Sequence, residues 1–87
     1  MQYTTYVSFM VKENGPPQLS SDNFRTLMNI VYLEGAINGL KKAKEAHKGT
    51  DAYYKYDVTI FREQKRLTDV TGNIAPNDLL QRMLNAL

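Results

Sequence analysis

The chemistry open to this chain is limited first by its single histidine, His47. One imidazole provides neither a proton relay nor a multi-histidine metal site, and a histidine among lysines at a helix end is more often solvated than a general base. The sequence contains no cysteine, which excludes thiolate nucleophiles, thiolate metal sites and disulfides. Ser8, Ser20 and Ser21 lie outside any nucleophile-elbow pattern, and helix capping is the expected role of the latter two.

Two carboxylates, Asp57 and Glu63, are the remaining candidates for acid and base chemistry. On a predicted strand they lie roughly 20 Å apart, which is too far for paired-carboxylate catalysis. Asp57 is expected instead to pair with Lys12 or Lys55. The five glycines form no phosphate-binding loop or dinucleotide motif. We therefore expect no enzyme, no cofactor, no metal and no small-molecule substrate.

The charge of the chain is concentrated in its middle third. The formal net charge is +2, but residues 41–66 hold eight Lys and Arg against four acidic residues, a net of +4. Such a concentration favours an anionic partner, and Tyr6, Tyr53 and Phe61, on the open face of the predicted sheet, are of the type that stacks on bases. Nucleic-acid binding is therefore the alternative function, through the basic residues Lys41, Lys42, Lys44, Lys48, Arg62, Lys65 and Arg66.

The element that must position these residues is a long helix predicted over residues 21–48. Its first half is apolar nearly all round, so two of its faces must be buried against other elements or another copy of the chain. Gly35 and Gly39 lie four residues apart on one face, and each costs about 1 kcal/mol relative to alanine in a helix interior. They mark either a kink or the close approach of a neighbour, and we favour the neighbour.

Strands are predicted on either side of this helix. Alternating β-branched and aromatic residues predict a strand over 3–12 and another over 53–63, with Tyr54, Tyr56, Val58 and Ile60 on the core face. Residues 67–71 are predicted to form a short third strand. Pro76 opens a last helix with an apolar stripe that ends at Leu87.

These elements predict one α+β domain spanning residues 1–87. The expected architecture is a small two-layer sandwich of order β-α-β-(β)-α, with a mainly antiparallel three-stranded sheet and two helices on one face. It resembles a truncated ferredoxin-like arrangement. The open face of that sheet is more apolar than a surface without a binding role is expected to be.

We interpret the chain as a non-enzymatic protein-binding module that acts as a homodimer. It is of the regulator or inhibitor type, a class that includes proteins encoded by mobile elements. Its expected partner-binding residues are Tyr6, Met10, Tyr53, Lys55 and Phe61 on the sheet, with Gly35 and Gly39 on the helix. The chain shows neither a signal-peptide pattern nor an apolar run of ~20 residues. A cytoplasmic location, with no membrane contact, is therefore expected.

Overall fold

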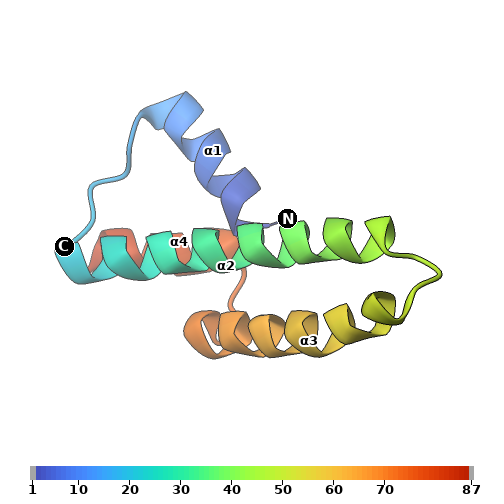
Figure 1. The fold of residues 1–87 in the computed structure, drawn as a ribbon. Helices are drawn as coiled ribbons and strands as arrows, with labels where there is room; N and C mark the ends of the chain where they lie inside the picture. Colours follow the sequence, from blue (N-terminus) through green and yellow to red (C-terminus); the bar gives the residue numbers. More distant parts are fainter. Residues whose placement is uncertain (1, 87) are drawn as a thin grey trace.

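The computed structural model describes residues 2–86, and within them it contains four α-helices and no strand. The helices are α1 (Tyr3–Asn14), α2 (Ser21–Ala46), α3 (Asp51–Thr71) and α4 (Pro76–Asn85). α2 and α3 run side by side in opposite directions as a long hairpin, while α1 and α4 gather on the first half of α2 (Figure 1). The molecule is correspondingly elongated, with extents of 48 × 25 × 19 Å.

The predicted α+β sandwich is wrong, because all three predicted strands lie within helices. The strand expected over residues 3–12 is α1, whose inward residues are Tyr3, Tyr6, Val7 and Met10. This spacing of three, four and seven residues is that of a helix face. The aromatic and β-branched residues that favoured a strand express a preference that depends strongly on tertiary context.

The two strands predicted over residues 53–63 and 67–71 are both parts of the single helix α3. Helical spacing turns Ile60 and Leu67 toward the rest of the molecule. Tyr54 and Val58, which the strand prediction placed in the core, are instead among the most exposed large side chains. In a strand every second residue lies on the same face, whereas a helix turns once in 3.6 residues and so places Ile60 on a different side from Tyr54 and Val58.

The two predicted helices are confirmed, with a shift at one end. α2 begins at Ser21, and the Oγ of Ser20 accepts a hydrogen bond from the backbone N–H of Asn23 at 3.2 Å, as expected of an N-cap. The helix runs without interruption through both of its glycines and ends at Ala46, two residues before the predicted end. α4 begins at Pro76, as predicted, and ends at Asn85. Leu87, the predicted end of its apolar stripe, lies outside the described residues.

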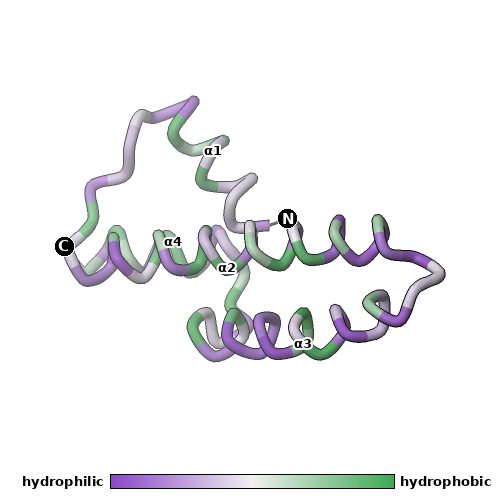
Figure 2. The backbone as a smooth tube through the Cα atoms, viewed as in Figure 1, coloured by the Kyte–Doolittle hydropathy of each residue, from purple (hydrophilic) through white to green (hydrophobic). Residues whose placement is uncertain are grey.

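The core lies where α1, α2 and α4 meet. Its buried residues are Tyr3, Leu27, Ile30, Leu80 and Met83, and the half-buried Leu67 and Val70 from the end of α3 pack against them. A tight turn makes this meeting possible, because Gly72 and Asn73 both adopt positive φ angles, of 63° and 60°, and redirect the chain from α3 to α4. Figure 2 shows that apolar and polar segments alternate along the backbone of these helices.

A buried carboxylate joins α1 to α2. Glu34 is only 5% exposed, and its side chain accepts hydrogen bonds from the backbone N–H of Tyr3 at 2.6 Å and of Thr4 at 2.6 Å. It also accepts a hydrogen bond from the Thr4 hydroxyl at 2.7 Å. The N-cap residue of α1, Gln2, makes no side-chain capping bond. Glu34 therefore serves as the cap of α1, with its negative charge at the positive end of the helix dipole.

Tyr3 ties the same helix to the turn before α4, because its hydroxyl donates a hydrogen bond to the backbone carbonyl of Ile74. Burial raises the pKa of the Tyr3 phenol, and the neighbouring Glu34 carboxylate raises this pKa further. The folded protein therefore favours the neutral phenol.

Replacing Glu34 should release α1. We expect Glu34→Ala to lower the free energy of unfolding by about 1–3 kcal/mol, because buried N–H donors lose their acceptor. Urea denaturation would measure this loss, and hydrogen exchange should show early deprotection confined to residues 3–14. Glu34→Gln, which keeps one acceptor oxygen, should lose less. Equal stability of Glu34→Ala and the unmodified chain would contradict the capping role.

Tyr3 should ionise at a pH above the ordinary range of a tyrosine. Because its pKa is raised in the folded state, the stability that this shift contributes is present below the ordinary pKa of about 10 and is lost as the pH rises through the folded value. An ultraviolet titration of the six tyrosines should show a late component that Tyr3→Phe removes. Identical titration curves for the two proteins would refute this assignment.

Candidate functional site

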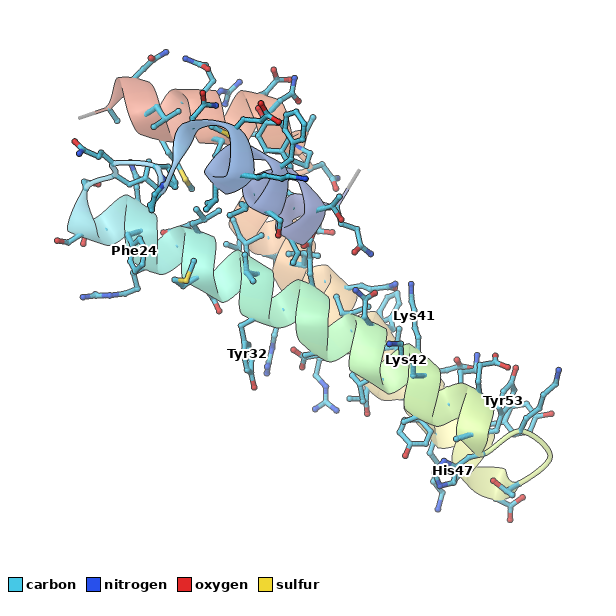
Figure 3. The ribbon with its side chains drawn as sticks, turned by 90° about the horizontal axis from the view of Figure 1, so that it is seen from above. Phe24, Tyr32, Lys41, Lys42, His47 and Tyr53 are labelled. Atoms are coloured by element: carbon cyan, nitrogen blue, oxygen red, sulfur yellow. The ribbon has the colours of Figure 1, made fainter. Side chains whose placement is uncertain are left out.

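One side of α2 carries apolar side chains that nothing in the described chain covers. We call it the α2 outer face and define it by Phe24, Met28, Tyr32, Gly35 and Gly39, which share one side of the helix. Tyr32 is 72% exposed, and Phe24 and Met28 are also exposed. In Figure 3, Phe24 and Tyr32 project from the side of α2 that lies away from α1 and α4.

A hollow lies at the first turns of this face. It is lined by Leu19, Ser21, Phe24, Arg25 and Met28, and its volume is about 520 Å³. The apolar rim formed by Leu19, Phe24 and Met28 suits a hydrophobic side chain of a docking protein. Arg25 supplies a positive charge beside it.

The two glycines of the α2 outer face have no role in the fold itself. A Cβ atom added at Gly35 or Gly39 would meet no atom within 4 Å, and neither glycine adopts a positive φ. Alanine would fit both positions, yet each glycine costs about 1 kcal/mol of helix stability. The absent side chains leave a shallow strip where another backbone can approach α2 closely.

A second uncovered apolar surface runs along the side of α3 that faces away from α2. We call it the α3 outer face and define it by Asp51, Tyr54, Val58, Phe61 and Lys65. Its three apolar members are 68–71% exposed and are spaced by four and three residues, so they form one continuous stripe.

The residues predicted to bind a partner do not share a surface. Tyr6 and Met10 pack against the core, and Tyr53 lies half-buried at the hairpin tip. Lys55 and Phe61 are exposed on α3, whereas Gly35 and Gly39 lie on α2. The exposed apolar residues of the two outer faces other than Phe61 were not predicted, although their helical spacing was a usable signal; they are Phe24, Met28, Tyr32, Tyr54 and Val58.

The hairpin tip is organised around Lys44. Its Nζ lies 2.6 Å from a carboxylate oxygen of Asp57 and 4.6 Å from the centroid of the Tyr53 ring. The predicted pairing of Asp57 with Lys12 or Lys55 is therefore wrong. The hydrogen bond to Asp57 raises the pKa of Lys44, which keeps the ammonium charged. These contacts fasten the C-terminal end of α2 to the beginning of α3.

His47 lies at the same tip, where its side chain contacts the end of α2 and an aromatic ring of α3. Its Nδ1 lies 2.8 Å from the carbonyl oxygen of Ala43, and its ring centroid lies 5.4 Å from that of Tyr56. The side chain is exposed at the end of α2, next to the labelled Tyr53 in Figure 3. This arrangement fits a helix-terminal residue that bonds a free carbonyl.

The basic residues predicted to contact nucleic acid are spread along the hairpin. Lys41, Lys42 and Lys48 are exposed near the end of α2, but Lys44 is paired with Asp57. Arg66 donates a hydrogen bond to Glu63 at 3.2 Å. Arg62 and Lys65 are exposed on α3. Because Arg66 follows Asp51 by four helical turns, it lies roughly 22 Å from the tip.

A groove of about 520 Å³ separates α2 from α3 on one side of the hairpin. Its lining includes the Glu63–Arg66 ion pair and Asp69, together with Tyr32 and apolar residues of both helices. It contains no histidine, and no cluster of three metal-ligating side chains occurs in residues 2–86. No helix in this described range is long and apolar enough to cross a membrane.

Comparison with models of known protein families, with curated proteins and with solved structures gave no match. Function is therefore inferred from the geometry of this chain. The two outer faces are its most unusual surfaces, because water contacts large apolar side chains along both.

Substituting alanine for either glycine of the α2 outer face should stabilise the isolated protein. We expect Gly35→Ala and Gly39→Ala each to raise the free energy of unfolding by about 1 kcal/mol, because the open space accepts a methyl group and the helix gains propensity. Urea denaturation provides the measurement. Gly72→Ala is the control that should destabilise, since Gly72 has a φ of 63°. Destabilisation by Gly35→Ala would show that the fold needs this glycine.

Proposed function

We propose that this protein is a non-enzymatic protein-binding module of the regulator or inhibitor type, acting in the cytoplasm as a homodimer. Its α2 outer face docks a helix of a protein partner. The observation that carries this proposal is the combination, on one face, of exposed Phe24 and Tyr32 with two glycines that weaken the helix and serve no contact inside the chain. Large apolar anchors beside a strip open to close backbone approach suit helix-on-helix docking.

The length of α2 supports this proposal. The face extends from Phe24 to Gly39, which is about 22 Å along the helix axis and thus four turns. A partner helix laid along it would bury its own apolar stripe against Phe24, Met28 and Tyr32. At Gly35 and Gly39, where no side chain intervenes, the partner would approach more closely.

The charges beside the face indicate the chemistry of the partner. Arg25 is exposed near one end, and Lys42 is exposed near the other. A partner helix with apolar residues along one side, small residues opposite the glycines and acidic residues near both ends fits this pattern. Electrostatic attraction at the rim would guide association, while the apolar contacts would supply most of the affinity.

Nucleic-acid binding through the basic middle third is the weaker candidate. Lys41, Lys42 and Lys48 are available for phosphate contacts, but Lys44 and Arg66 already have acidic partners. Acidic residues also alternate with the basic ones along the hairpin, which lowers the field that a polyanion would experience.

Affinity capture followed by direct titration tests the proposal. Proteins captured on the unmodified chain would be identified, purified and titrated against Gly35→Leu, in which a bulky side chain blocks the close approach of a helix. We expect affinity to fall by roughly tenfold or more, equivalent to ~1.4 kcal/mol. Gln64→Leu is the matched control, because it places the same side chain at an exposed position outside both outer faces.

Salt separates the two candidate functions. Capture through apolar contacts should depend weakly on ionic strength, whereas phosphate contacts would give an affinity that falls steeply with salt and weakens when Lys41, Lys42 and Lys48 become alanine. A partner that binds Gly35→Leu as tightly as the unmodified chain would overturn the docking proposal. A salt-sensitive complex with nucleic acid alone would favour the alternative.

A further inference from the structure

We propose that the α3 outer face pairs with the same face of a second copy, antiparallel, about a two-fold axis at Val58. This inference rests on the homodimer part of the proposed function and assigns it a surface, an orientation and a register. The partner-docking part involves the outer face of the other helix, α2, and stands or falls separately.

The apolar part of the face has the spacing of a helix-pairing seam. Tyr54, Val58 and Phe61 follow one another at intervals of four and three residues, as in the heptad repeat of coiled coils. All three are 68–71% exposed in the single chain. Val58 stands near the middle of the stripe, so an antiparallel second copy would bring Tyr54 of each chain to Phe61 of the other.

The charges at the two ends of the stripe determine its orientation. Asp51 precedes Val58 by seven residues, Lys65 follows it by seven, and both lie on the same face. An antiparallel pair with its axis at Val58 therefore places Asp51 of each copy beside Lys65 of the other, twice. A parallel pair would place Asp51 against Asp51 and Lys65 against Lys65.

These two charges have no partner within the described part of the chain. Neither Asp51 nor Lys65 belongs to an ion pair there. They cannot pair with each other inside one chain, because fourteen residues of helix separate them by about 21 Å. A second copy supplies the missing partner of each.

The rim of the pair partly opposes this arrangement. Lys55 and Arg62 lie on one flank of the stripe, and Lys55 of each copy would approach Arg62 of the other. Both are long, solvated side chains at the edge, where repulsion is screened by salt and relieved by rotation. The Asp51–Lys65 pairs lie in line with the apolar seam, at its two ends, where the contact between the copies partly excludes water and strengthens the interaction between charges.

The α2 outer face is a poorer surface for a second copy. The antiparallel register that lays Tyr32 of one copy over Gly35 of the other would bring Arg25 of each copy close to Lys42 of the other. Both ends of that pairing would be repulsive, whereas both ends of the α3 pairing are attractive. Charge complementarity therefore assigns the second copy to α3 and leaves α2 for a different protein.

The dimer should be reversible. Pairing along one helix of 21 residues gives a contact about 31 Å long and 10 Å wide, a projected area of roughly 300 Å² on each copy. Stable interfaces of standard size bury about 800 Å² per partner. We therefore expect monomer and dimer to exchange in the micromolar range or above.

Sedimentation velocity over a wide concentration range tests this pairing. The unmodified chain should pass from monomer to dimer, and Val58→Asp, which places two carboxylates at the axis, should remain monomeric with an unchanged helical circular dichroism spectrum. Tyr32→Asp is the matched control, since it changes an equally exposed apolar residue on the α2 outer face and should leave the dimer intact.

A charge exchange tests the register without altering the apolar seam. Asp51→Lys and Lys65→Asp should each weaken dimerisation by roughly tenfold, and the double variant should recover most of the loss. Asp51→Lys and the double variant share the same change at the beginning of α3, so recovery between them reports only the contact between copies. This comparison also decides the matter if Val58→Asp fails to fold.

Several results would overturn the inference. They are a chain that stays monomeric at every concentration, a dimer that Tyr32→Asp abolishes but Val58→Asp does not, or a double variant as weak as either single one. Failure of this kind with intact partner binding would leave the docking proposal standing. If the dimer follows the predicted pattern but Gly35→Leu binds every partner normally, the pairing through α3 stands and the docking proposal is refuted.

Discussion

The buried carboxylate of Glu34 fixes the arrangement on which both outer faces depend. A charge this deeply buried is tolerated only when donors surround it, and the first turn of α1 supplies three of them. These hydrogen bonds set which side of α2 faces α1 and α4. Leu33 and Ile37 of the same helix are also buried. With these sides occupied, the remaining side, which carries Phe24, Tyr32 and the two glycines, has to face water.

Sequence reasoning succeeded for α2 and α4 because their signals are local. Ser20 is an N-cap, Pro76 is at the first helical position, and long helical periodicity follows each of them. It failed for α1 and α3, whose aromatic and β-branched residues fit either period over short stretches. Helix α1 obtains its cap from Glu34, thirty residues away in sequence, and a contact of that range leaves no local pattern.

The candidate site was predictable in part. Gly35 and Gly39 were identified from their spacing, and the apolar surface around them followed from a helix that is hydrophobic nearly all round. The exposure of Tyr54 and Val58 was not foreseen, because a strand would have turned both toward the core with Ile60. The surfaces therefore became visible only with the hairpin, in which Ile60 faces inward and those two residues face outward.

The two outer faces lie on different helices of the hairpin, and Lys44 of α2 pairs with Asp57 of α3 between these helices. Antiparallel pairing through α3 would leave the α2 outer face of each copy uncovered, with the two faces related by the two-fold axis. Such a dimer presents two identical docking faces. A partner that is itself repeated or dimeric would gain avidity from the second contact when the spacing of its helices matches that of the faces. A reversible dimer would then be strengthened by the very partner that it binds, because each bound pair of faces holds the two copies together.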